Sequence, residues 1–177
     1  MRLVLAMSCA AALCACAGSG GRVETLSRAP SRAYARLAVA GVSAPGALGG
    51  EDLPRALAAA LSDRFEAAAA ADADSVVSSA ELGLSGASPG MLAELRRATG
   101  AEAVVFGALT RRADALELTV LDARTGDLVL RVRVRPQGEA FGSAREAAAA
   151  GAAALAPLAS GRRGKAVTPE PDELPPP

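Results

Sequence analysis

The chain has 177 residues with balanced formal charge, 19 Lys and Arg against 19 Asp and Glu, and it contains no histidine. The charge balance gives no indication of a nucleic-acid partner, and without imidazole there is no Ser–His or Cys–His nucleophile pair and no histidine metal ligand. All three cysteines lie in the first sixteen residues, so the rest of the chain has neither a disulfide nor a thiolate metal site. We therefore expect no cofactor, no metal and one domain with a core of Ala, Leu and Val.

The N-terminus has the pattern of a secretory signal, with Arg2, an apolar run from Leu3 to Ala12, and then Leu13-Cys14-Ala15-Cys16. The run is shorter than the about 20 apolar residues that a transmembrane helix needs. Leu13 and Ala15 before Cys16 resemble the bacterial lipoprotein box. In that family signal peptidase II cuts ahead of the cysteine, and acyl chains are added to the new N-terminus.

The resemblance implies that residues 1–15 are a signal peptide and that Cys16 is lipidated and attaches the chain to a membrane. No Asp follows Cys16 to act as an inner-membrane retention signal, which favours the outer membrane facing the periplasm. Ordinary signal-peptidase cleavage after Ala17 is the alternative, and it would release a soluble protein.

Residues 16–35 lack periodicity and are expected to form a lipidated flexible tether. A first strand is predicted at Arg36–Val42 and is followed by a Pro- and Gly-rich loop. A helix capped by Asp52 and ended by Asp72 to Asp74 comes next, with Leu53, Leu57, Leu61 and Phe65 on one stripe. A brief strand is predicted at Ser75–Ser78.

The second half begins with a helix from Ser88-Pro89 to Gly100, whose inward positions are Met91, Leu92, Leu95 and Ala98. The apolar run Ala103–Leu109 predicts a central strand covered on both faces. Two alternating strands flank the turn Asp122–Asp127, with Leu128, Leu130, Val132 and Val134 predicted to point inward.

An Ala-rich helix, Glu139 to about Ala156, ends at Pro157, and residues 161–177 are expected to be a disordered Pro-rich tail. Residues 36–160 are thus predicted to be one α/β domain. It is a single sandwich with three helices and a mixed five-stranded sheet, whose first three strands are parallel and whose last two form an antiparallel hairpin.

Three segments together resemble one superfamily of envelope proteins: Gly100–Gly107, Leu121–Asp127 and the helix Leu53–Phe65. The superfamily includes the curli-secretion channel lipoprotein, the amino-terminal domain of the Tol-system translocation protein and several flagellar outer-membrane lipoproteins. The resemblance implies a non-catalytic periplasmic domain that assembles with other envelope proteins or with itself.

No residue is assigned to catalysis. The glycines of the loop Gly41–Gly50 miss the spacing of a dinucleotide-binding loop, which favours a flexible connection over anion binding. The carboxylate pairs lie at helix starts or turns, which explains them without catalysis: Glu51/Asp52, Asp72/Asp74 and Asp122/Asp127. The candidate serines lack a histidine partner, and one of them caps a helix: Ser62, Ser75, Ser78 and the capping Ser88. Arg131, Arg133 and Arg135 share one strand face, which predicts a solvated face or edge protection, with an acidic docking surface as the alternative.

The sequence therefore predicts a lipid-anchored periplasmic binding or scaffold lipoprotein of a cell-envelope or secretion assembly, partnered by an envelope protein or by itself. Two alternatives stay open. One is a secreted soluble α/β hydrolase that uses carboxylates, and the other is a structural envelope protein that self-associates through the Leu128–Val134 edge.

Overall fold

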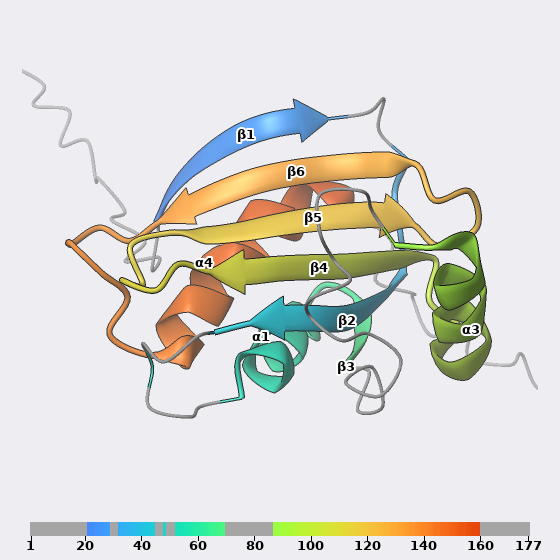
Figure 1. Cartoon of the computed structure of the whole chain (residues 1–177), viewed down its shortest axis with the longest axis horizontal. Coiled ribbons are helices and arrows are strands. Elements are labelled where there is room, and N and C mark those ends of the chain that lie inside the picture. The colour runs from blue at the N-terminus through green and yellow to red at the C-terminus, as the bar shows by residue number, and fades with distance from the viewer. Residues whose placement is uncertain (1–20, 29–31, 45–47, 49–51, 70–86, 160–177) are drawn as a thin grey trace, which may run out of the picture.

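The computed structural model describes residues 21–28, 32–44, 48, 52–69 and 87–159. This part of the chain forms one mixed sheet with the strand order β1-β6-β5-β4-β2-β3 (Figure 1). The strands are β1 Arg22–Arg28, β2 Arg36–Ser43, β3 Glu66–Ala69, β4 Ala103–Leu109, β5 Leu116–Asp122 and β6 Leu128–Arg135. The helices are α1 Leu53–Leu61, α3 Pro89–Thr99, α4 Ala144–Leu155 and the short 3-10 helix η1 Ala156–Leu158.

The predicted parallel pairing of Arg36–Val42 with Ala103–Leu109 and the predicted antiparallel hairpin of the two following strands are confirmed, but the predicted number of strands is wrong. β2 pairs in parallel with β3 and β4, and β4, β5, β6 and β1 pair antiparallel in succession. The sheet has six strands rather than five because β1 adds to the outer side of β6. β1 lies within the range 16–35 that was expected to be a flexible tether.

The third parallel strand also differs from the expected one. β3 follows directly after α1, and the predicted strand Ser75–Ser78 lies outside the described residues. The predicted cap of α1 is confirmed, since a side-chain oxygen of Asp52 accepts a hydrogen bond from the backbone N–H of Arg55 at 3.0 Å. The helix ends at Leu61, well before the predicted stop, and the chain turns there to bring Phe65 into the core.

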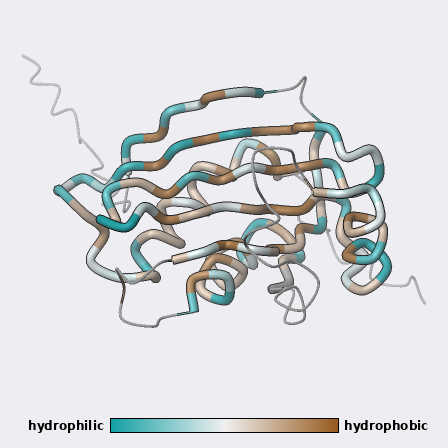
Figure 2. The backbone as a smooth tube through the Cα atoms, in the orientation of Figure 1, coloured by the Kyte–Doolittle hydropathy of each residue, from teal (hydrophilic) through white to brown (hydrophobic). Residues whose placement is uncertain are grey.

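One face of the sheet carries the main core. Helices α1 and α4 lie side by side behind the sheet (Figure 1) and pack on β2, β4, β5 and β6. Figure 2 shows that hydrophobic residues run along the strands and that hydrophilic residues gather at the turns at both ends of the sheet. Gly151 allows α4 to pack close to β5, because a Cβ at this position would lie 3.1 Å from side-chain carbons of Leu116 and Leu118.

The opposite face has a smaller apolar cluster at the end where α3 packs (Figure 1). The predicted boundaries of α3 are confirmed: Ser88 caps it, and Gly100 ends it with a left-handed φ of 67°. Leu92 and Leu95 face the cluster as predicted, whereas Ala98 is exposed. The domain is therefore a two-layer sandwich with α3 closing one end of the second face.

Two predictions about the C-terminal half need correction. Leu128 is exposed because a register shift between Val120 and Leu121 turns it away from the helix-covered core. Helix α4 begins at Ala144 rather than at Glu139, because the hydroxyl of Ser143 accepts a hydrogen bond from the backbone N–H of Glu146.

Candidate functional site

The predicted lipidation site, Cys16, lies outside the described residues. Its distance along the chain from the folded domain is nevertheless informative. Strand β1 begins at Arg22, only six positions after Cys16, and Arg22 pairs with Arg135 at the end of β6. Lipidation at Cys16 stays a prediction, but the point at which the chain enters the domain is defined.

β1 is an edge strand whose outer side has no partner among the described residues. All seven of its residues are exposed, and it contains two of the three large hydrophobic side chains that are exposed in the described part, Val23 at 44% and Leu26 at 39%. Exposed edge strands with apolar side chains are sites at which another strand can add. The expected edge at Leu128–Val134 is wrong, because β1 covers β6; among the described strands the edges of the sheet are β1 and β3.

The face of the sheet opposite α1 and α4 carries an ion-pair cluster, which we define as Glu117, Arg131 and Arg133. Nε and Nη2 of Arg133 donate to Oε1 of Glu117 at 2.9 and 2.6 Å, and Nη2 of Arg131 lies 3.6 Å from Oε2. These hydrogen bonds and the negative charge of Glu117 raise the pKa of Arg133 above its usual value. Two of the three arginines predicted on this strand thus share one carboxylate within the sheet, which leaves the cluster with a net positive charge.

Asp122 is the single buried charged residue among the described positions and holds three segments together. Its Oδ1 accepts the backbone N–H groups of Arg124 and Thr125 at 2.9 and 3.1 Å, which forms the β5–β6 turn. Its Oδ2 lies 3.3 Å from both the hydroxyl of Tyr34 and Nη1 of Arg32.

Burial acts to raise the pKa of Asp122, but these backbone hydrogen bonds, the Tyr34 hydroxyl and the Arg32 charge outweigh it and lower the pKa below the usual value. Burial and the neighbouring Asp122 raise the pKa of Tyr34. The carboxylate is therefore ionised and fully occupied with donors. It fixes structure and has no lone pair directed at a substrate.

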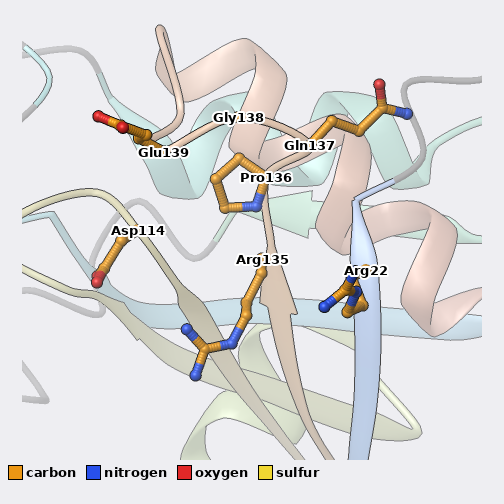
Figure 3. A pocket seen from close by; sticks show the side chains of 7 residues that line it. All are labelled: Arg22, Asp114, Arg135, Pro136, Gln137, Gly138 and Glu139. Carbon is orange, nitrogen blue, oxygen red and sulfur yellow. The ribbon is translucent and has the colours of Figure 1, made fainter.

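A shallow cavity of about 550 Å³ lies at the end of the sheet where β1 starts and β6 stops (Figure 3). It is lined by Arg22, Asp114, Arg135, Pro136, Gln137, Gly138 and Glu139. Thr110 donates its hydroxyl to Asp114, and this bond lowers the pKa of Asp114 despite some burial, with further contributions from the nearby Arg135 and Arg112. Both signs of charge are present in equal number, two arginines and two carboxylates.

A second groove, of about 670 Å³, runs between α1 and α4. Alanines form most of its lining, and the charged side chains at its rim include Asp52 and Arg55, which pair with each other at 3.5 Å. A groove of this composition has no convergent polar groups that could orient a small molecule.

The remaining sequence candidates have structural roles or lie outside the described residues. Asp52 and Ser88 cap helices, and the hydroxyl of Ser62 donates to the carbonyl oxygen of Ala59 at 2.7 Å. Within the described ranges no group of three or more Asp, Glu, Cys or His side chains could hold a metal ion. The residues that are not described are Glu51, Asp72, Asp74, Ser75, Ser78 and half of the loop Gly41–Gly50.

Sequence reasoning missed the role of Glu102. Its Oε2 accepts the backbone N–H of Ala35 at 2.7 Å and that of Arg36 at 3.4 Å, so the acidic residue of the Gly100–Gly107 segment fixes the start of β2. The contact spans more than 60 residues of sequence, and only the resemblance of that segment to a superfamily pattern pointed to the position.

None of the helices in the described part of the chain is long and apolar enough to cross a membrane.

Comparison with known proteins identifies the fold. No protein-family model matches the chain, and no curated protein matches it in sequence. Two solved structures of the PelC dodecamer from Paraburkholderia phytofirmans, one a single-substitution variant, are 18% identical, with TM-scores of 0.51 and 0.50. The matches cover 79% and 80% of this chain and 99% of each PelC chain. Lipoprotein GNA1162 from Neisseria meningitidis is 17% identical, with a TM-score of 0.43, over 59% of this chain and 81% of that chain. The domain therefore has the fold of the PelC subunit.

Proposed function

We propose that this chain is a lipid-anchored lipoprotein of the outer membrane whose periplasm-facing domain self-associates and acts as a non-catalytic scaffold in an envelope assembly. The observation that carries the proposal is the fold match to almost the whole PelC chain, which forms a dodecamer, behind a lipoprotein-like sequence at Cys16. The described side chains support it, because the carboxylates of Asp122 and Glu117 accept hydrogen bonds from structural partners.

The shape of the sheet supports self-association in a ring. A closed ring of many copies needs a heterologous contact, in which one surface of a subunit meets a different surface of the next. In the described part of the chain the sheet has two different edges, β1 on one side and β3 on the other. We assign β1 to the contact between copies, because its backbone is open and Val23 and Leu26 would be buried by a neighbour.

The test of self-association measures the mass of the full-length protein, purified in detergent, by light scattering. We expect a defined oligomer for the wild type and a shift to monomer for Val23→Lys/Leu26→Lys, because charges on an edge strand oppose strand addition. Leu128→Lys is the matched control, since Leu128 is exposed to a similar extent, 37%, but lies at the start of β6, away from β1. A wild type that stays monomeric at all concentrations would refute the scaffold proposal.

The test of the anchor is independent of the oligomeric state. Cys16→Ala should release the protein from membranes without lowering its thermal stability, because the residue precedes the folded domain. Intact-mass measurement of the wild type should give a chain that begins at Cys16 and carries added acyl mass. An unmodified chain that begins beyond Cys16 would contradict lipidation.

A further inference from the structure

Strand β1 makes the link between the anchor and the domain short. Six Cα–Cα steps separate Cys16 from Arg22, which span at most about 20 Å when extended and about 13 Å as a root-mean-square distance. A tether that reached residue 35 would leave the domain free to tumble above a bilayer. If Cys16 is lipidated, as the proposed function states, the first residue of β1 is held close to the headgroups.

The strand register defines which end of the sheet is held there. Arg22 pairs with Arg135, Val134 pairs with Leu116, and Leu116 pairs with Leu109. The start of β1 therefore lies at the same end as the β4–β5 turn at 110–115 and the loop at 136–139 (Figures 1 and 3). The β5–β6 turn and α3 lie at the other end, about 25 Å farther along the eight-residue strands.

The held end has an excess of exposed positive charge, which we call the basic end: Arg22, Arg111, Arg112 and Arg135. Among the described residues these four guanidinium groups take part in no ion pair within 4.0 Å. The carboxylates of the same end are Asp114, which is hydrogen-bonded to Thr110, Glu139, Glu146 and Asp52, and the last two have Arg145 and Arg55 beside them. Among the described residues, six cations against four anions leave this end positive, although the whole chain is neutral.

We propose that the basic end docks on the phosphates of anionic lipid headgroups and holds the sheet upright on the membrane. Guanidinium groups form bidentate hydrogen bonds with phosphate, and the attraction of basic residues to an anionic surface falls off over about 8 Å at physiological ionic strength. The short link lets the basic end come within that range, whereas Arg96 and Arg97 of α3 lie at the far end. Upright copies would present their β1 edges at one height, which favours a ring parallel to the bilayer.

The experiment uses the full-length lipidated protein reconstituted in vesicles, with one fluorescent label on an introduced cysteine. The domain has no cysteine of its own, so Gly138→Cys reports the basic end and Ala93→Cys on α3 reports the far end. Both positions are exposed, and a Cβ at position 138 meets nothing within 4 Å. The readout is the quenching of each label by a headgroup-attached quencher in phosphatidylglycerol vesicles and in phosphatidylcholine vesicles.

In phosphatidylglycerol vesicles we expect quenching at position 138 to exceed that at position 93 by at least about twofold, and we expect the ratio to approach one when Arg22, Arg111 and Arg112 are replaced by Gln, because each basic residue near an anionic surface adds to the attraction. Arg96→Gln/Arg97→Gln should leave the ratio unchanged. Equal quenching at both positions in phosphatidylglycerol, or a ratio that does not respond to loss of the three arginines, overturns the docking proposal. Failure of the protein to remain on any vesicle after a salt wash contradicts instead the lipid anchor on which the docking rests.

Discussion

The two faces of the β5–β6 hairpin differ in chemistry although neighbouring residues of the same strands form them. Leu116, Leu118, Val120, Val132 and Val134 are buried beneath α1 and α4. Glu117, Thr119, Arg131 and Arg133 point to the other side and are only half-buried. The helix-covered face provides the hydrophobic stabilisation, whereas the open face holds charges that pair with one another. The difference shows that the stability of the domain and its outward chemistry can be altered separately.

The largest effect is expected from Leu118→Ala on the helix-covered face. Leu118 is fully buried, and its removal leaves a cavity between the sheet and α4. The free energy of unfolding should fall by about 3–5 kcal/mol, a large fraction of the stability of a domain of this size. Urea denaturation measures the loss. Thr119→Ala is the control, because Thr119 is the next residue of β5 and lies on the open face. This variant should lower the free energy of unfolding far less.

Asp122→Ala should have the second-largest effect, about 2–3 kcal/mol, because two backbone N–H groups and the Tyr34 hydroxyl lose their acceptor. Asp127→Ala in the same turn is the control, since its exposed side chain accepts no such set of bonds. If the free energy of unfolding falls no more than it does in the control, the buried carboxylate of Asp122 does not stabilise the domain.

The same residue predicts a pH dependence. The folded state lowers the pKa of Asp122 below its unfolded value near 3.8. The contribution of this carboxylate to the free energy of unfolding is therefore fully present above the unfolded pKa and is lost as the pH falls through the pKa of the folded state. The wild type should therefore lose its stability advantage over Asp122→Ala on acidification. Denaturation curves for both proteins between neutral and acid pH provide the measurement, and a constant difference would contradict the assignment.

Gly107→Ala should lower the free energy of unfolding by about 1–2 kcal/mol through overpacking. A Cβ at this position of β4 would overlap the carbonyl oxygen of Glu117 and lie 2.8 Å from a methyl carbon of Leu118. Gly90→Ala, where a Cβ meets nothing within 4 Å, should leave thermal stability equal or slightly raised. Equal melting temperatures for both variants would show that the sheet can relax around the methyl group.

The smallest effect is expected on the open face, from Glu117→Gln. The variant keeps the shape of the side chain but removes the charge shared by Arg131 and Arg133. Its loss of stability should be smaller than that of Gly107→Ala and should vanish at high salt, because partly exposed ion pairs are screened. A loss that persists in high salt would mean that the cluster is as important as the apolar face.

Local signals explain what could be predicted from the sequence. The helix ends at Asp52, Ser88 and Gly100 are defined by hydrogen bonds to residues at most four positions away. Such local contacts leave a pattern in the sequence, so these helix ends could be predicted. β1 was not predicted, because hydrophobic periodicity detects strands with a buried face and all side chains of β1 are exposed. The alternation of Val23 and Thr25 with charged residues was a signal of a strand, as was Ser143 three residues before Glu146 for the start of α4.

The candidate site was less predictable because it depends on contacts distant in sequence. The turn around Asp122 was expected, but its bonds to Tyr34 and Arg32 come from a segment almost 90 residues earlier. The basic end likewise forms only when the register of β1 brings Arg22 beside Arg135. A pattern in one stretch of sequence contains no information on such partners.

The pairing of β1 with β6 also dictates an order of folding. Arg22 and Arg135 lie more than one hundred residues apart, so the first strand to be synthesised is among the last to find its partner. Closing so large a loop is slow until the strands between are in place. If the chain is exported from its N-terminus, β1 cannot pair with β6 until most of the chain has been translocated.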